Sequence, residues 1–317
     1  MDEMTTEISA VAVFINIICL YGFGAMSYII PMFTGVYRRG FFCDDETILF
    51  KFQPNTVPVA ALISVSIIMT LLSILFCEYY VMYKLESTIS RPSYRWRNSH
   101  IQAYIVESLI YFAYSQIGFI VQLVLTQSTK YTIGRLRPHF IDVCKPVNYT
   151  CTTEHDYIAD YTCTGDLKRI REGRLSFFSG HSCMAVYSAV FAILYLQSRL
   201  GGRMSSRLFL PIIQTFLLTA SLLVCYSRIT DNWHHWSDVL VGMLVGATVA
   251  IYTAVFWGGF FKHRRGYAPL NDPSGVHILA STIATTNGSL RTRNNSNEEP
   301  TSSGYGTTTA TVPPTPA

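Results

Sequence analysis

Residues 57–82 read VPVAALISVSIIMTLLSILFCEYYVM and are mostly apolar. An α-helix of about 20 mostly apolar residues is long enough to cross the hydrocarbon core of a bilayer. In lipid, every backbone polar group must find its partner within the segment, so a spanning stretch of this kind is helical. Residues 57–82 therefore predict a transmembrane helix.

Five further stretches have the same character, and the composition of the whole chain agrees with them. The chain has 317 residues, of which 50% are apolar and 14% are charged, whereas about 25% of residues are charged in soluble domains. The net charge of +4 is too small for a nucleic-acid-binding protein. The predicted spans cover residues 8–30, 57–82, 101–125, 184–200, 208–226 and 239–260. We expect an all-α, polytopic membrane protein with six transmembrane helices.

The orientation of these helices is predicted from the basic residues between them. Lysine and arginine gather after the second, fourth and sixth spans, for example at Lys84, Arg199 and Lys262. Because such residues concentrate in cytosolic loops, both termini are expected inside and the connections after the first, third and fifth spans outside. The first span follows acidic residues and has no basic leader region, so it is expected to be retained rather than cleaved.

Two features of the outer connections support this orientation. Asn148 begins a glycosylation sequon, Asn-Tyr-Thr, whose acceptor must lie outside the cytosol. Disulfides persist on that side of the membrane, and the outer connections contain Cys43, Cys144, Cys151 and Cys163. Four cysteines allow three pairings, and the sequence does not choose among them.

The chain divides into a membrane domain and a tail. Residues 1–265 contain all six spans, whereas residues 266–317 are rich in Thr, Ser, Asn, Gly and Pro. A segment of that composition buries too little apolar surface to fold, so we expect a disordered cytosolic tail. Gly242 and Gly246 in the sixth span have the spacing of close helix contacts, which we attribute to packing within the bundle. The oligomeric state, including a homo-oligomer, is left open.

Three polar clusters stand out near the ends of the predicted spans. They are KYTIGRLRP at residues 130–138, SGH at residues 179–181 and SRITDNWHHWSD at residues 227–238. The first follows the third span, the second precedes the fourth, and the third joins the fifth to the sixth. Since successive helices alternate in direction, all three clusters are expected on the same face of the membrane.

The residue types in these clusters suit a phosphate group. Lys130, Arg137 and Arg228 are fixed cations, and arginine binds phosphate through two parallel hydrogen bonds. Ser179 and Gly180 lie where a span begins, and the free N–H groups at the start of a helix favour an anion. The clusters contain no acidic cage for a metal ion, so we expect neither a metal nor another cofactor.

The histidines suit the transfer of that phosphate. His234 and Asp238 are four positions apart and so share one face of a helix. A carboxylate that holds one imidazole nitrogen leaves the other free as a nucleophile. His181, on a different segment, could then protonate the departing alkoxide. His235 lies three positions from Asp238 and competes with His234 for this role.

Simpler interpretations cover several neighbouring residues. Arg135 is expected to anchor a helix end at the membrane interface, and His139 is expected to be a cap or a surface residue. Trp233 is expected in an interfacial aromatic belt, and Glu78 and Glu107 are expected at the opposite interface. What favours a functional site is the coincidence of three clusters on one face, not any single residue.

The three clusters resemble the signature of the type 2 phosphatidic acid phosphatase (PAP2) superfamily, which is K-x6-R-P, then P-S-G-H, then S-R-x5-H-x3-D. The chain departs from that pattern at Phe178, which stands in the proline position. Over residues 35–260 it is also similar to the animal lipid phosphate phosphatases. This resemblance implies a haloperoxidase-like helical catalytic core, with the tail outside it.

The resemblance implies a role for each matching residue. His234 would be the nucleophile that becomes a phosphohistidine, His181 would be the acid, and Asp238 would orient His234. The phosphate would be bound by Lys130, Arg137, Ser179, Gly180 and Arg228.

The resemblance also implies an activity and a place. The activity would be metal-independent removal of phosphate from phosphatidate, lysophosphatidate, ceramide 1-phosphate and sphingosine 1-phosphate, all of them membrane lipids. The site would face the outside or a lumen, in the plasma membrane and also in endomembranes. The alternatives are a catalytically silent lipid-binding scaffold, a phosphatase of the same fold for polyprenyl diphosphates or sugar phosphates, and a transporter. Silent relatives typically lose the nucleophile or the acid, whereas both histidines are present in this chain. A transporter needs broken helices or polar residues at the midplane, and neither pattern is evident in the predicted spans.

Overall fold

The computed structural model describes residues 5–7, 9–85, 93–96, 99–153 and 155–261. The chain forms two units, Met1–Tyr267 and Ala268–Ala317, and every described residue belongs to the first. The tail expected at residues 266–317 lies outside the described residues, and so do the basic residues expected to follow the sixth span.

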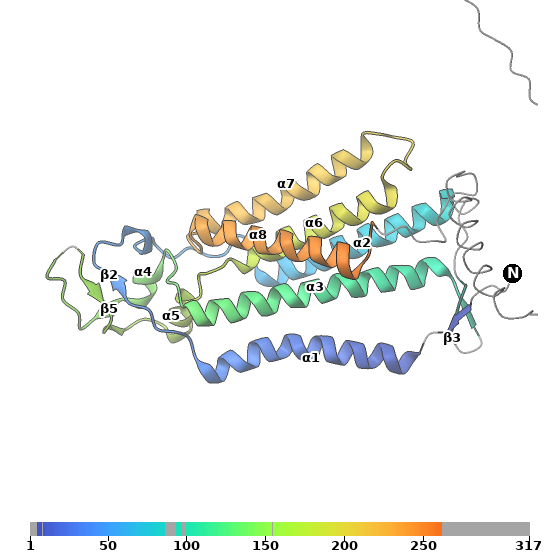
Figure 1. The fold of residues 1–317 in the computed structure, drawn as a ribbon. Coiled ribbons are helices and arrows are strands. Elements are labelled where there is room, and N and C mark those ends of the chain that lie inside the picture. Colours follow the sequence, from blue (N-terminus) through green and yellow to red (C-terminus); the bar gives the residue numbers. More distant parts are fainter. Residues whose placement is uncertain (1–4, 8, 86–92, 97–98, 154, 262–317) are drawn as a thin grey trace, which may run out of the picture. The chain divides into compact units, whose positions relative to one another are not determined.

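Six long helices form a bundle (Figure 1). They are α1 (Ala10–Thr34), α2 (Val59–Leu85), α3 (Ala103–Ile133), α6 (Gly180–Leu200), α7 (Phe209–Thr230) and α8 (Trp236–Tyr252), which continues into a π-helical turn, η3 (Thr253–Trp257). Each is long and apolar enough to cross a membrane, so the prediction of a six-helix membrane protein is confirmed. The helical backbone runs further than the apolar count indicates, because α3 continues to Ile133 and α6 begins at Gly180.

The central helix of the bundle is α6, which contacts α2, α3, α7 and α8. Of its apolar stretch 72% is buried, against 11% for α1. Two glycines of α8 allow the close approach of α6, because a Cβ on Gly242 would meet the Ser179 carbonyl at 2.5 Å and one on Gly246 would overlap the Cys183 carbonyl. The two glycines therefore pack within the bundle, as expected.

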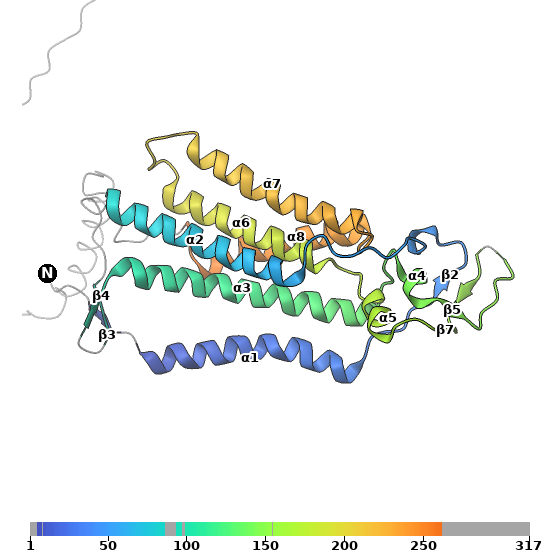
Figure 2. The same cartoon turned by 180° about the vertical axis from the view of Figure 1, so that it is seen from behind.

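The helix α1 lies at the edge of the bundle, beside α3 (Figures 1 and 2). Large apolar side chains of α1, such as Val11, Phe14 and Ile18, are more than half exposed. Since lipid tails are as apolar as these side chains, such a surface is typical of a helix that faces the bilayer.

The two long connections, residues 35–58 and 134–179, form a head at one end of the bundle (Figures 1 and 2). The head contains β2 (Phe41–Phe42), η1 (Glu46–Ile48), α4 (Phe140–Cys144), β5 (Pro146–Val147), β6 (Tyr157–Ile158), β7 (Thr162–Cys163) and α5 (Leu167–Gly173). β2 pairs antiparallel with β6, and β5 pairs antiparallel with β7. The disulfide Cys43–Cys151 joins the two connections and Cys144–Cys163 closes the second, which resolves the pairing that the sequence left open.

At the opposite end, here called the far end, three short strands form a sheet in the order β1 (Thr5–Glu7), β3 (Ser93–Trp96), β4 (Ser99–Ile101). Nearby, the side chains of Glu78 and Glu107 are fully buried rather than interfacial. Arg199 explains the difference, because its Nε donates to Glu78 at 2.7 Å and its Nη2 donates to Glu107 at 3.0 Å. Buried charges of this kind persist only when they are paired.

Candidate active site

The first polar cluster begins in the last turn of α3, which carries Lys130. The helix ends at Ile133 and is capped by Gly134, whose φ of 59° is left-handed and whose missing Cβ makes room for the Tyr37 carbonyl. Beyond it, the chain runs beside the segment that precedes α6. Arg135 accepts a backbone hydrogen bond from Ser176 at 3.0 Å, and Arg137 donates one to Gly173 at 2.8 Å. These bonds bring the first two clusters together.

The second cluster forms the start of α6. Ser179 is the N-cap, and its Oγ accepts hydrogen bonds from Ser182 N at 3.3 Å and Ser182 Oγ at 2.9 Å. The hydroxyl proton of Ser179 is therefore still available to donate. A Cβ built on Gly180 would lie 3.8 Å from Lys130 Nζ, so the Lys130 ammonium reaches the helix start. A helix N-terminus and a nearby ammonium both favour an anion.

The third cluster is the tight turn between α7 and α8. Asn232 adopts a positive φ of 59°, and the N–H groups of Trp233 and His234 both donate to the Arg228 carbonyl at 3.1 Å. His235 is the N-cap of α8, and its backbone N–H donates to Asp238 Oδ2 at 3.1 Å. A carboxylate in the first turn is a common way to satisfy the free N–H groups of a helix start.

Asp238 is fully buried and joins all three clusters. Its Oδ1 accepts from Arg135 Nη1 at 2.6 Å, and its Oδ2 accepts from Ser176 Oγ at 2.6 Å. Arg135 is therefore part of the site, and its interpretation as an interfacial anchor is wrong. The two neighbouring imidazoles also face Oδ2, with Nδ1 of His235 at 3.2 Å and Nδ1 of His234 at 3.8 Å.

The imidazole of His234 is 3% exposed, and its Nδ1 has no hydrogen-bond partner among the described residues. Arg137 and Lys130 interact with it electrostatically. Burial, reinforced by these two cations, lowers the pKa of His234 well below 6.5. The ring is therefore neutral at neutral pH, which is the form a nucleophilic imidazole needs.

Arg137 is a buried cation with hydrogen-bond capacity to spare. Its Nε and Nη1 have no partner among the described residues, although its Nη2 donates weakly to the Leu175 carbonyl at 3.4 Å. The guanidinium lies over the Trp233 ring, 4.4 Å from the ring centre. Burial lowers the pKa of Arg137 to about 10, so it remains charged at neutral pH. Unpaired donors on a buried charge are costly, which points to an anion as their partner.

Arg228 is also fully buried, but the protein holds it on several sides. It donates to Ser227 Oγ at 2.8 Å, to Asn55 Oδ1 at 2.8 Å and to Asp231 Oδ2 at 2.8 Å. Its position is thus fixed before any ligand binds. Together with Lys130 and Arg137 it interacts electrostatically with His181, so cations of the first and third clusters both act on the histidine of the second.

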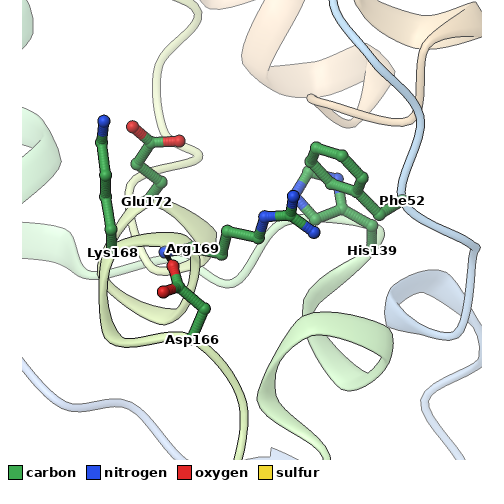
Figure 3. A pocket seen from close by; sticks show the side chains of 6 residues that line it. All are labelled: Phe52, His139, Asp166, Lys168, Arg169 and Glu172. Atoms are coloured by element: carbon green, nitrogen blue, oxygen red, sulfur yellow. Dashed lines mark hydrogen bonds between the residues drawn. The ribbon is translucent and has the colours of Figure 1, made fainter.

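A cavity of about 200 Å³ lies in the head beside these residues, lined by Phe52, His139, Asp166, Lys168, Arg169 and Glu172 (Figure 3). The Arg169 side chain extends towards the rings of Phe52 and His139. Both rings also contact Trp233, which in turn lies against Arg137. Trp233 therefore links two rings of the cavity wall to the Arg137 guanidinium.

His139 is the N-cap residue of α4, as one of the two expectations had it, although its side chain makes no capping hydrogen bond. It is not a surface residue, because it is 2% exposed and its Nδ1 lies 2.7 Å from the Asn232 carbonyl. Trp233 donates from Nε1 to the Gln53 carbonyl at 3.0 Å, and its ring lies against the Arg137 guanidinium, so it contacts the site, which the expectation of an aromatic belt did not include.

Three further contributors to the site are not predicted by the sequence patterns. They are Arg135, Ser176 and the segment at residues 50–57, which contacts Arg228 and His181. The available signal for Ser176 and Arg135 was their position within or next to a polar cluster. Residues 50–57 carry no pattern of charged or histidine residues, and only the fold brings them to the site.

The chain is similar to known proteins over most of its length. Residues 109–262 match the PAP2 superfamily. A Caenorhabditis elegans protein, "phospholipid phosphatase homolog 1.2 homolog", is 47% identical over 242 residues, which are 76% of this chain and 71% of the relative. Mouse phospholipid phosphatase 1 is 32% identical over 86% of this chain and 94% of its own, and human phospholipid phosphatase 2 is 36% identical over 80% and 85%. No solved structure matches.

Proposed function

Because the chain belongs to the phospholipid phosphatases of the PAP2 superfamily and is a multi-pass lipid phosphate phosphatase, we propose that it acts through a phosphohistidine formed on His234. Its substrates are phosphatidate, lysophosphatidate, ceramide 1-phosphate and sphingosine 1-phosphate. These share a phosphate monoester on a lipid alcohol, which is the group the three clusters suit.

The reaction proceeds in two displacements. The Nε2 of neutral His234 attacks phosphorus, a P–N bond forms, and the ester P–O bond breaks. His181 gives its proton to the departing alkoxide, so the lipid alcohol leaves neutral. In the second step His181, now a base, takes a proton from water, whose oxygen attacks phosphorus. The P–N bond breaks, and inorganic phosphate and neutral His234 are restored.

Asp238 orients the nucleophile through Nδ1 of His234. The present distance of 3.8 Å is longer than a hydrogen bond, and such contacts often tighten only in the substrate complex. His235 is nearer, but its backbone and ring already cap α8. The spacing of the family signature also favours His234 as the nucleophile.

The phosphate oxygens are held by Lys130, Arg137, Arg228, the Ser179 hydroxyl and the N–H groups around Gly180. The observation that carries this assignment is that the buried Nε and Nη1 of Arg137 have no partner within the described part of the chain and lie beside a neutral buried imidazole. Donors fixed in advance around the transferring group stabilise the charge of the transition state at little reorganisation cost.

We further propose that the site faces the outer leaflet at the plasma membrane, and the lumen in endomembranes. The sequon at Asn148 lies in the head, at the same end of the bundle as the site. Asn148→Gln should therefore speed gel migration after expression in animal cells. Unchanged migration of the variant, with or without glycosidase, would count against this orientation.

The mechanism is tested by phosphate release from mixed micelles. His234→Ala should abolish turnover, whereas His235→Ala should retain most of it, and the exposed His155→Ala serves as control. Activity should survive EDTA and fall with vanadate, which resembles pentacoordinate phosphorus. If His234→Ala turns over substrate and His235→Ala does not, the roles of the two histidines are reversed. Dependence of activity on added Mg²⁺ would refute the metal-independent mechanism.

The same assay separates the alternative functions. A silent scaffold would release no phosphate from any lipid in the wild type. A phosphatase for polyprenyl diphosphates or sugar phosphates would prefer those substrates in direct competition with phosphatidate. The retention of both histidines, Asp238 and Lys130 supports the catalytic alternative.

A further inference from the structure

One segment outside the three clusters contacts all of them. Residues 50–57, FKFQPNTV, here called the strap, connect the head to α2. The strap donates from Phe50 N to the Pro138 carbonyl at 3.0 Å in the first cluster. Its Val57 carbonyl is 3.1 Å from His181 Nε2 in the second, and its Asn55 Oδ1 accepts from Arg228 in the third.

Two neighbouring strap residues fix the Arg228 guanidinium, one by a direct hydrogen bond and the other through the Asp231 carboxylate. Asn55 accepts directly from Nη1 of Arg228 at 2.8 Å. Thr56 donates from its N–H at 2.9 Å and from its hydroxyl at 2.7 Å to the carboxylate of Asp231. That carboxylate in turn accepts from Nη2 of Arg228 at 2.8 Å. The guanidinium plane is therefore set by the strap and not only by α7.

The strap also sets the ring of His181. A carbonyl oxygen can only accept, so the contact with Val57 requires the proton on Nε2. The nitrogen that gains and loses a proton is then Nδ1. Val57 precedes Pro58, which restricts Val57 to extended backbone, so the direction of its carbonyl is fixed by the sequence.

We propose that the strap is a positioning element for the phosphatase reaction, with Asn55 and Thr56 as positioning residues of Arg228 and the Val57 carbonyl as the orienter of His181. The proposal rests on the proposed function of Arg228 and His181. None of the three strap groups takes part in the reaction itself. Each acts by holding Arg228, which binds the phosphate oxygens, or His181, which transfers the proton, and misplacement by about 1 Å can cost about 100-fold in rate.

The test uses full-length protein in mixed micelles with Asn55→Ala and Thr56→Val. Thr56→Ser keeps the hydroxyl and should restore wild-type behaviour, and Thr47→Val, in the same connection but away from the site, is the matched control. Asn55→Ala and Thr56→Val should lower kcat about 10- to 100-fold. The inhibition constant of vanadate should rise by a similar factor, because Arg228 no longer presents its donors in one orientation.

A second measurement separates positioning from a general loss of structure. In an Arg228→Lys background, Asn55→Ala should lower kcat by less than about twofold, since residues that act through one another are not additive. If Arg228→Lys leaves too little turnover, vanadate-induced thermal stabilisation replaces kcat as the readout. Thermal unfolding without vanadate is recorded for every variant.

Unchanged kcat and vanadate inhibition in both single variants, or a full additive loss in the Arg228→Lys background, would overturn the strap proposal. A Thr56→Ser enzyme that is as slow as Thr56→Val would contradict the positioning role of the Thr56 hydroxyl. Failure of the proposed function has a different pattern, because the wild type and Thr47→Val would then release no phosphate from any lipid. Vanadate stabilisation still tests the strap in that case.

Discussion

Arg135 and Asp238 form an ion pair with 2.6 Å between Nη1 and Oδ1, although 103 positions separate them in the chain. The pair joins the segment after α3 to the first turn of α8. Asp238 is fully buried, and a buried carboxylate persists only with a close cation and satisfied lone pairs. Because Arg135 and Ser176 each hold one oxygen, they set the plane in which Oδ2 faces the histidines.

Arg135→Ala should lower kcat about tenfold or more, because loss of a hydrogen bond to a charged group costs about 1.5–3 kcal/mol. The carboxylate would turn away from His234, so KM should change less than kcat. Phosphate release from mixed micelles measures both constants. Arg38→Ala, an exposed arginine of the head, is the control. An Arg135→Ala enzyme with wild-type kcat would show that Asp238 needs no orientation by Arg135.

Arg137→Lys should weaken phosphate binding although it keeps the charge. Lysine cannot supply the fork of donors that Nε and Nη1 offer, neither of which is paired with any residue the structure describes, and it stacks less well on Trp233. We expect the inhibition constant of vanadate to rise about tenfold, which corresponds to about 1.4 kcal/mol. Lys168→Arg, in the wall of the cavity beside the site, is the matched control. Equal vanadate inhibition in Arg137→Lys and wild type would contradict a bidentate role.

The helices and the motifs could be predicted from the sequence because both are local signals. Apolar length alone predicts the six spans, and alternation of helices predicts that the three clusters share one end. The pairing of Arg135 with Asp238 is not predicted, because a basic residue near a span end is usually an interfacial anchor. Its true partner is brought near only when α8 packs against α6, and no local pattern reports that contact.

Local sequence patterns also fail to predict the contacts of the strap and those of Glu78, Glu107 and Arg199 at the far end. Asn55 and Thr56 have ordinary loop composition, and their contacts to Arg228 and Asp231 depend on how the head sits over the bundle. Glu78, Glu107 and Arg199 each look interfacial when taken alone. They pair with one another only because the start of α3 lies beside the last turns of α2 and α6, which is a tertiary fact. Disulfide pairing is unpredictable for a similar reason.

Acid should destabilise the folded protein partly through His139. Burial lowers the pKa of His139 from 6.5 to about 4. Between these values the unfolded chain binds a proton at this residue and the folded chain does not, so stability falls as pH drops through that window. The full effect is about 3 kcal/mol at most. His139→Asn should show a shallower loss of thermal stability between pH 7 and pH 4.5, and parallel curves would contradict this.

Arg199→Ala should destabilise the bundle while leaving catalysis intact in molecules that fold. The change leaves Glu78 and Glu107 buried without their cation, and breaking a buried pair costs about 3–5 kcal/mol. The cluster lies at the far end, so kcat per folded molecule should equal that of the wild type. Thermal unfolding in detergent measures the first effect and micelle kinetics the second, with the exposed Arg207→Ala as control. A reduced kcat at unchanged stability would mean instead that the far end is coupled to the site through α6.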